Sequence, residues 1–187
     1  VLVDRHAILR GEVLNRLLGV RGPEESRLPD RMEGHVIVAG FGLAGEELAS
    51  ALKACGIPHV VADLNVDNIR HARKKGHPVL FGDVTSQEVL HHLRVGDASE
   101  LVLLLNDPDA TARAVRAARA SAPSLSILAR TPYVLDVPAL KAAGATEVVA
   151  GEAEAAAAVA ERVLSRRGIC GEAAEDRLGR IRARAQE

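Results

Sequence analysis

Residues 35–45 read HVIVAGFGLAG, and this stretch decides the fold. Its first half is short, apolar and β-branched, which is typical of a buried parallel strand. Its second half has the glycine spacing GxGxxG, and residues 43–55 then have the apolar spacing of a helix. A GxGxxG between a strand and a helix indicates a phosphate-binding loop. The alternative is a glycine-rich turn that binds no ligand.

The same order of strand and helix recurs along the chain to about residue 164. Strands are expected at 35–39, 59–63, 78–81, 101–105, 126–130 and 147–150, and helices at 43–55, 66–75, 86–93, 108–120, 134–143 and 152–164. Short connections between alternating strands and helices require right-handed crossovers and a parallel sheet. The predicted fold class is therefore α/β, a Rossmann-type doubly wound six-stranded parallel sheet with helices on both faces.

Two segments flank this predicted domain, which spans residues 34–164. Residues 1–33 are expected to form an amphipathic helix, from the apolar spacing between positions 8 and 18, followed by a linker. Residues 165–187 contain Arg, Glu and Gly with little periodicity, so a frayed helix or a disordered tail is expected. The chain starts with Val1 and not with Met, which suggests a piece of a longer protein whose preceding part lies in a membrane.

Composition argues against several classes of function. The 187 residues hold 24 Lys+Arg against 25 Asp+Glu, whereas nucleic-acid binding usually needs a basic excess. Aromatic residues make up 2%, which leaves no stacking platform for single-stranded bases. The sequence contains neither a Cys/His cluster at metal-ligand spacing nor a nucleophile–base signature. We expect no nucleic-acid partner, no metal and no enzymatic activity.

The glycine loop is the first candidate site. Gly40 suits a tight turn, Gly42 lets backbone approach a pyrophosphate, and Gly45 allows close packing of helix and strand. The helix N-terminus that follows presents free N–H groups to a phosphate. Asp63, at the end of the second strand, is placed to accept hydrogen bonds from ribose hydroxyls and disfavours NADP. The alternative role for Asp63 is to cap the next helix.

Further polar residues follow the other strands, whose carboxyl ends line the ligand crevice in sheets of this kind. Gly82-Asp83 follows the third strand, where it could meet an adenine or where Asp83 could cap the next helix. Asn106-Asp107 ends the fourth strand, with an Asx-Pro turn as the alternative reading. Arg130 ends the fifth strand and could bind a phosphate or a carboxylate bidentately, or form only a surface salt bridge.

These motifs resemble the regulator-of-potassium-conductance domain, also called RCK, KTN or TrkA-N. The resemblance lies in HVIVAGFGLAG, VVADLNVDNIRHARKKGHPVLFGDVT and LRVGDASELVLLLNDPDA, and it covers roughly residues 34–164. The leading NRLLGVRG is similar to the link after the last membrane helix of Kef-type cation–proton antiporters. One departure is Ala129-Arg130-Thr131-Pro132, which lacks the second basic residue of the glutathione-gated Kef proteins and so puts glutathione control in doubt.

The resemblance implies a regulatory domain that binds an adenine nucleotide, either AMP/ADP or NAD(H), and forms a homodimer. It further implies that the nucleotide gates potassium or cation–proton transport by an attached membrane domain, on the cytoplasmic side of the inner membrane. The cofactor-binding residues carried over to this sequence are Gly40, Phe41, Gly42, Leu43, Ala44, Gly45, Asp63, Leu64, Asn65, Gly82, Asp83, Val84, Asn106, Asp107 and Arg130.

Alanine-rich helices at 108–120 and 152–164 give an independent reason to expect a homodimer, because they carry more alanine than one sheet face needs to bury. Two alternative functions remain. One is the coenzyme domain of an NAD-dependent oxidoreductase, although few residues follow Leu164 to build a substrate site. The other is a free-standing TrkA-like subunit of a potassium uptake system.

Overall fold

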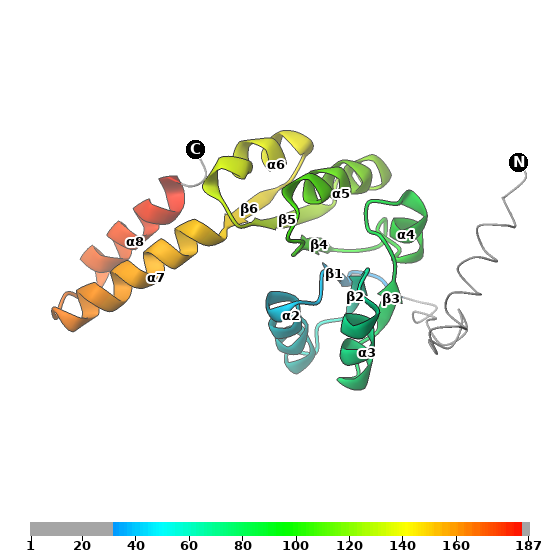
Figure 1. Ribbon diagram of the computed structural model, residues 1–187, viewed down its shortest axis with the longest axis horizontal. Helices are drawn as coiled ribbons and strands as arrows, with labels where there is room; N and C mark the ends of the chain where they lie inside the picture. Colours follow the sequence, from blue (N-terminus) through cyan, green and yellow to red (C-terminus); the bar gives the residue numbers. More distant parts are fainter. Residues whose placement is uncertain (1–31, 185–187) are drawn as a thin grey trace, which may run out of the picture.

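A six-stranded parallel sheet forms the centre of the computed structural model, which describes residues 32–184 (Figure 1). The expected helix between positions 8 and 18 lies outside the described residues. The strand order is β3-β2-β1-β4-β5-β6, with every neighbouring pair parallel, so the predicted doubly wound Rossmann-type fold is confirmed. The strands are β1 (Val36–Ala39), β2 (His59–Asp63), β3 (Val79–Phe81), β4 (Glu100–Leu103), β5 (Ser126–Thr131) and β6 (Glu147–Ala150).

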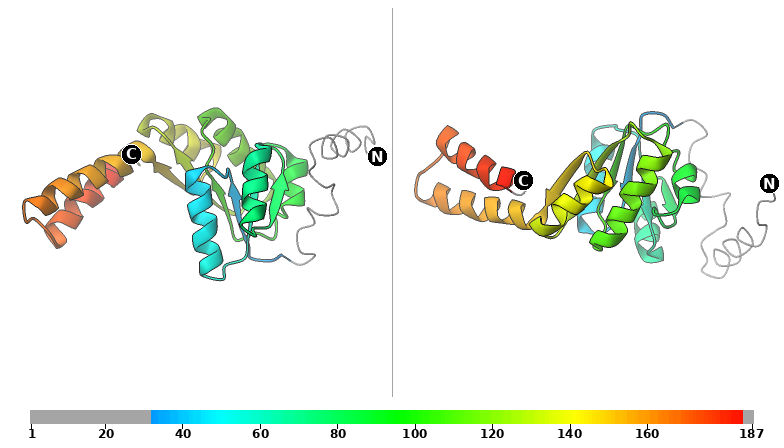
Figure 2. Two further views of the ribbon diagram at one scale, coloured as in Figure 1. Left: turned by 60° about the horizontal axis from the view of Figure 1, so that its bottom comes forward. Right: turned by 90° about the horizontal axis from the view of Figure 1, so that it is seen from above.

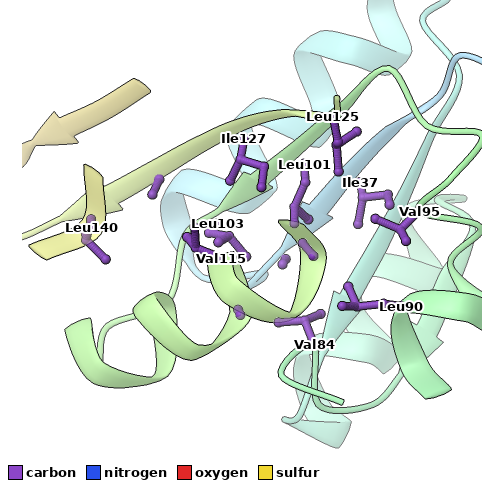
Figure 3. Close-up of a cluster of buried hydrophobic side chains, with 14 of the residues drawn as sticks. Ile37, Val84, Leu90, Val95, Leu101, Leu103, Val115, Leu125, Ile127 and Leu140 are labelled. Atoms are coloured by element: carbon purple, nitrogen blue, oxygen red, sulfur yellow. The ribbon is translucent and has the colours of Figure 1, made fainter. Parts of the chain in front are cut away.

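Helices cover both faces of the sheet, as expected. The helices are α2 (Leu43–Ala54), α3 (Val66–Lys74), α4 (Gln87–His92), α5 (Pro108–Ser121), α6 (Val137–Ala143), α7 (Gly151–Arg166) and α8 (Glu172–Arg184). The helices α2 and α3 bury their apolar sides on one face, and α4, α5 and α6 do so on the other. The second face holds the larger core cluster, which includes Ile37, Leu101 and Ile127 from three adjacent strands (Figure 3).

Local signals explain why the expected boundaries agree with the structure to within two residues, apart from the start of α6. Asp107 caps α5 by accepting a hydrogen bond from the backbone N–H of Asp109, and Pro108 occupies the first turn. At its other end, α6 stops at Gly144, whose φ of 111° is left-handed. The segment Val134–Asp136, expected as the first turn of this helix, forms a 3₁₀ turn instead.

The last two helices differ from the expectation. Residues 165–187 were expected to be frayed or disordered, yet α8 forms a helical hairpin with α7 that projects from the sheet (Figures 1 and 2). Ala174 and Leu178 are buried at i, i+4 spacing, and half-buried Ile181 continues it at i+7. This apolar stripe is narrow and interrupted by charges, which is why the sequence pattern was missed. Arg182 Nε also pairs with Glu154 Oε2 of α7 at 3.0 Å.

Three alanines of α5 face the core of the same chain. Its buried residues include Ala112, Ala114 and Ala118, which pack into the larger core cluster of the same chain. These three alanines therefore do not support a contact with a second copy, and the homodimer stays a prediction. Only Ala153 and Ala157 of α7 are buried, and beyond them this helix contacts α8 on one side and exposes Val159 and Val163. No helix of residues 32–184 is long and apolar enough to cross a membrane.

Candidate functional site

A cleft of about 800 Å³ opens at the carboxyl ends of the strands. It lies where the strand order reverses between β1 and β4, the place at which sheets of this architecture bind ligands. The structure brings the predicted site residues together there, with the exceptions of Phe41 and Asn65. The predicted residues that line the cleft are Gly40, Gly42, Leu43, Ala44, Gly45, Asp63, Leu64, Gly82, Asp83, Val84, Asn106, Asp107 and Arg130.

The three glycines of the loop differ in how closely the chain packs around them. Gly40 has a φ of 100°, and a Cβ there would lie 2.8 Å from the carbonyl oxygen of Leu104. A Cβ on Gly45 would overlap the carbonyl oxygen of Gly40. Gly42 has an ordinary φ of −78°, and a Cβ there would meet nothing within 4 Å. The described chain therefore gives structural reasons for Gly40 and Gly45, whereas Gly42 faces only the open cleft.

The N-terminus of α2 opens into the cleft without a side-chain cap. Its N-cap is Gly42, and the first hydrogen bond of the helix runs from the N–H of Glu46 to the Gly42 carbonyl. The N–H groups of the first turn are thus free to meet an anion, and the helix dipole adds a partial positive charge. By contrast, the N-termini of α3 and α5 are capped by the side chains of Asn65 and Asp107.

Asp63 holds the glycine loop and the start of α3. Its Oδ2 accepts from the backbone N–H of Phe41 at 2.6 Å and from Asn68 Nδ2 at 2.9 Å. Its Oδ1 accepts from the backbone N–H of Asn65 at 2.7 Å. Because Asn65 is the N-cap of α3, the alternative role of Asp63 as the helix cap is excluded. A carboxylate offers about four acceptor positions, so one remains for a ribose hydroxyl in the cleft.

Phe41 and Asn65 do not line the cleft. The Phe41 side chain is buried and packs against the rings of His77 and His71, with centroids 5.8 and 6.1 Å away. Its contribution is to anchor the loop to α3 and to the start of β3. Asn65 accepts hydrogen bonds from the backbone N–H groups of Asp67 and Asn68, so its side chain is occupied as a helix cap.

Asp83 lies on the β3 side of the cleft with an exposed side chain. Its Oδ1 accepts from the backbone N–H of Thr85 at 2.9 Å, which makes an Asx turn, whereas the N-cap of α4 is Ser86. The helix-cap alternative for Asp83 is therefore wrong. Gly82 is packed tightly, since a Cβ there would lie 2.8 Å from a methyl carbon of Val89.

The β4–β5 side of the cleft carries both signs of charge. Asp107 is the N-cap of α5, which agrees with the alternative in which it forms a turn before Pro108. Asp107 also lines the cleft. Its Oδ2 lies 3.9 Å from Arg113 Nη2. The Arg130 side chain makes no ion pair or hydrogen bond with any residue that the structure describes, so its salt-bridge alternative is not supported.

The sequence reasoning missed several lining residues. Arg113 points to the cleft from α5, one turn after Ala110, which also lines it. Asn68, in the first turn of α3, lines the cleft and donates to Asp63. Both lie on the helix that follows a strand and not at the strand end itself. The signal for such residues is a polar side chain in the first two turns of that helix. The other lining residues that were missed are Ala62, Thr85, Leu104, Leu105 and Ala110.

A cluster of charges outside the cleft joins α2 to α3. Glu46, in the first turn of α2, accepts from Lys75 and lies 3.1 Å from His71 Nε2. These hydrogen bonds, first that of Lys75 and then that of His71, hold the pKa of the Glu46 carboxyl below its usual value. The cluster therefore helps to fix the N-terminus of α2 relative to α3. Within residues 32–184, no group of three or more His, Cys, Asp or Glu could hold a metal ion.

Comparison with known protein families identifies the family of this chain. Residues 36–151 match the TrkA-N domain, and this range contains the whole sheet and the helices α2 to α6. The chain belongs to the TrkA-N family. This confirms the resemblance drawn from the glycine loop and the motifs after it.

The curated relatives of this TrkA-N domain include potassium antiporters. The chain is 36% identical over 143 residues to K(+) efflux antiporter 1, chloroplastic, of Arabidopsis thaliana, covering 76% of this chain and 12% of the relative. It is 29% identical over 178 residues to the glutathione-regulated potassium-efflux system protein KefC of Cronobacter sakazakii, covering 94% of this chain and 29% of the relative. The chain thus spans less than a third of either relative.

Solved structures with the same fold include nucleotide-bound ones. The TrkA-N domain of the inner membrane protein YbaL from Escherichia coli has a TM-score of 0.67 and 28% identity, over 70% of this chain and 96% of that one. GsuK bound to ADP has a TM-score of 0.61 and 27% identity, over 66% of this chain and 33% of that one. The AMP-bound C-terminal domain of Shewanella denitrificans Kef matches in fold, with a TM-score of 0.69 and 23% identity over 81% of this chain and 95% of that one.

Proposed function

We propose that this TrkA-N domain binds an adenine nucleotide in the cleft and thereby regulates cation transport by a membrane domain. One observation carries the nucleotide part: the uncapped N-terminus of α2 faces the cleft behind Gly42, a glycine with no structural reason in the described chain. Free N–H groups and a missing Cβ at one place favour a phosphate. Asp63, at the adjacent end of β2, then serves the ribose of the same ligand.

Known relatives support an adenine nucleotide over other phosphate compounds. Structures of the same fold hold ADP in one case and AMP in another. On the β3 side, Asp83, Val84 and Thr85 line the part of the cleft beyond the ribose position, where the base would lie. In this arrangement the glycine loop would bind the phosphate of the nucleotide and Asp63 its ribose, and the β3 side would contact its base.

The transport part of the proposal rests on the relatives. Both antiporters are much longer than the matched region, so the matched region is one part of a larger transporter in each. We assign this domain the same place, on the cytoplasmic side of the cell membrane, with a transporter domain as its partner. In this role the domain would bind the nucleotide without turning it over.

A homodimer completes the proposed mechanism. The outer part of α7 exposes Val159 by 60% and Val163 by 52%, an apolar surface that would be covered by a second copy. A ligand shifts a two-state equilibrium only if it binds the two states unequally. Two copies that rotate on such a contact supply two states, and the nucleotide would favour one of them.

A thermal-unfolding panel tests the nucleotide part of the proposal. The 187-residue chain is heated with AMP, ADP, NAD⁺, NADH, GMP or inorganic phosphate, and turnover of NADH is followed in parallel. At about 100 times its dissociation constant, a bound nucleotide adds about 2.7 kcal/mol to the free energy of unfolding, a shift that is easily measured. Stabilisation by adenine nucleotides without turnover supports the proposal. No shift with any of them, or steady turnover, would refute it.

A further inference from the structure

The chain enters β1 through a set of contacts with the turn between α4 and β4, which we call the clasp. The clasp joins Gly34 and His35 to Leu93, Asp97 and Ser99. The backbone N–H of Gly34 donates to the Asp97 carbonyl at 2.8 Å. The backbone N–H of Ser99 donates to the His35 carbonyl at 2.9 Å, and its hydroxyl donates to the Gly34 carbonyl at 2.9 Å. The two residues before β1 are therefore held by one turn of the chain.

The side chain of His35 connects the clasp to α4 itself. This side chain is fully buried, and its Nε2 lies 2.9 Å from the carbonyl oxygen of Leu93, which can only accept, so Nε2 donates. Its Nδ1 has no hydrogen-bond partner within residues 32–184. Because Leu93 is the C-cap of α4, the described hydrogen bond of the His35 ring depends on where α4 ends. Met32 is buried in the same core cluster as Leu90 and Leu93.

The turn in the clasp has a strained backbone. Arg94, which directly follows the C-cap of α4, has a φ of 54°, in the left-handed region that favours glycine. Within residues 32–184 no other residue apart from glycine has a positive φ. Such strain persists only where surrounding contacts hold it, and the clasp supplies contacts of this kind. The turn therefore has a reason to open when the clasp is lost.

The other end of α4 lies against the cleft. A Cβ on Gly82, which lines the cleft, would lie 2.8 Å from a methyl carbon of Val89, so the cleft wall packs directly on α4. Val84 also lines the cleft and belongs to the same core cluster as Leu90 of α4 (Figure 3). With six residues, α4 is too short to be stable as an isolated helix. Its stability therefore depends on its packing, with the cleft wall at one end and the clasp at the other.

We propose that α4 and the clasp open and close as one unit, and that a nucleotide in the cleft favours the closed state. This inference rests on the proposed nucleotide function and adds the route by which binding would reach the chain before β1. A ligand that packs against residues 82–85 stabilises the start of α4. In a segment that opens cooperatively, this stabilisation also protects the hydrogen bonds at the far end. The coupling is reciprocal, so an open clasp lowers the affinity for the nucleotide.

Amide hydrogen exchange of the 187-residue chain, resolved for single residues, tests this unit. The reporters are the hydrogen-bonded N–H groups of Gly34 in the clasp and of Leu90 in α4. Ser99→Ala removes the hydroxyl from the clasp, and because Ser99 is exposed, the variant should fold. Thr146→Ala is the matched control, because its hydroxyl lies in the corresponding turn before β6 and accepts from a backbone N–H of β5. Measurement at several low denaturant concentrations separates local opening from global unfolding, since only the latter exposes much surface.

We expect Ser99→Ala to speed exchange at Gly34 and at Leu90 by one common factor of about three to ten, whereas Thr146→Ala should leave both unchanged. ADP at about 100 times its dissociation constant should slow local exchange at both reporters by at least about tenfold. Faster exchange at Gly34 alone in Ser99→Ala would show that α4 and the clasp do not open together, which would overturn the inference. ADP that binds by calorimetry but slows neither reporter would overturn the coupling and leave the nucleotide function intact. Absence of ADP binding would overturn the nucleotide function and the coupling with it.

Discussion

His59 Nε2 lies 2.9 Å from His77 Nδ1, in a buried pair next to Phe41 of the glycine loop. The other ring nitrogen of His59 lies 3.0 Å from the carbonyl oxygen of Ile57, which can only accept, so this nitrogen donates. In neutral His59 the Nε2 atom is then the acceptor, and His77 Nδ1–H donates to it. Phe41 of the loop packs edge-on against His77, so the His59–His77 pair is in direct contact with the loop.

This pair predicts a dependence of stability on pH. Burial lowers the pKa of His77, and the nearby positive charges of His59, Lys53 and Lys75 lower it further against the opposite effect of Glu46. A histidine whose pKa is lower in the folded state than in the unfolded state binds more protons when unfolded. Stability is therefore complete above the unfolded value of about 6.5 and falls as the pH drops below it, by at most about 1.4 kcal/mol per pH unit for one proton.

Chemical denaturation at pH 7.5 and pH 5.5, with and without His77→Gln, measures this effect. The unchanged chain should lose stability between the two pH values, and His77→Gln should lose less, because the titrating group is gone. His91→Gln, an exposed histidine on α4, serves as the control and should keep the slope of the unchanged chain. An identical slope in all three proteins would show that His77 does not titrate in this range.

Asp63 should contribute both to stability and to nucleotide binding. Asp63→Ala leaves the backbone N–H groups of Phe41 and Asn65 and the side chain of Asn68 without their acceptor, and each such loss costs about 1–3 kcal/mol where the group is buried. Asp63→Asn keeps one oxygen and should be milder for the fold. We expect Asp63→Asn to weaken AMP, ADP and NAD⁺ binding by about tenfold, through the lost charge-assisted bond to the ribose.

Denaturant unfolding and calorimetry separate these two contributions of Asp63. Asn68→Ala is the matched control, because it removes one donor to Asp63 and leaves the carboxylate in place. Affinity in Asp63→Asn that equals the affinity of the unchanged chain would restrict Asp63 to its role in holding the loop.

The exposed part of α7 should hold the homodimer together. Replacing Val159 and Val163 by Asp places two charges on the apolar surface that a second copy would cover. Light scattering should report a dimer for the unchanged chain and a monomer for the double variant. Leu135→Asp is the control, since Leu135 is 90% exposed but lies outside α7. A monomeric unchanged chain at tens of micromolar would contradict the dimer.

The sequence predicts best those features of the structure that are set by residues close to one another in the chain. The β-branched run before Gly40 and the caps at Asp107 and Gly144 are local, so strand and helix boundaries could be predicted closely. The rule that strand ends line the crevice placed Asp63 and Arg130 at the cleft. These residues owe their positions to the topology, which the alternation of elements already determines.

Other features depend on packing that a local pattern does not contain. The side chain of Phe41 is turned away from the cleft because the rings of His71 and His77 offer it a buried site. The direction of α7 depends on packing as well, because only Ala153 and Ala157 of this helix are buried and the helix contacts α8 more than the sheet. Arg113 joins the cleft only because α5 presents that face to it.

The most direct test of a nucleotide site at the start of α2 is the affinity of Gly42→Ala for ADP and AMP, measured by calorimetry. A Cβ at this position meets nothing within 4 Å, so the variant should fold, with a change in unfolding free energy of at most about 1 kcal/mol from the altered N-cap. Gly96→Ala is the matched control, because a Cβ at Gly96 also meets nothing within 4 Å and Gly96 does not line the cleft. The account predicts that Gly42→Ala loses at least about tenfold in affinity for both nucleotides while Gly96→Ala keeps it, because the added methyl group would occupy the place of the phosphate. A folded Gly42→Ala variant that binds both nucleotides as tightly as the unchanged chain would contradict it.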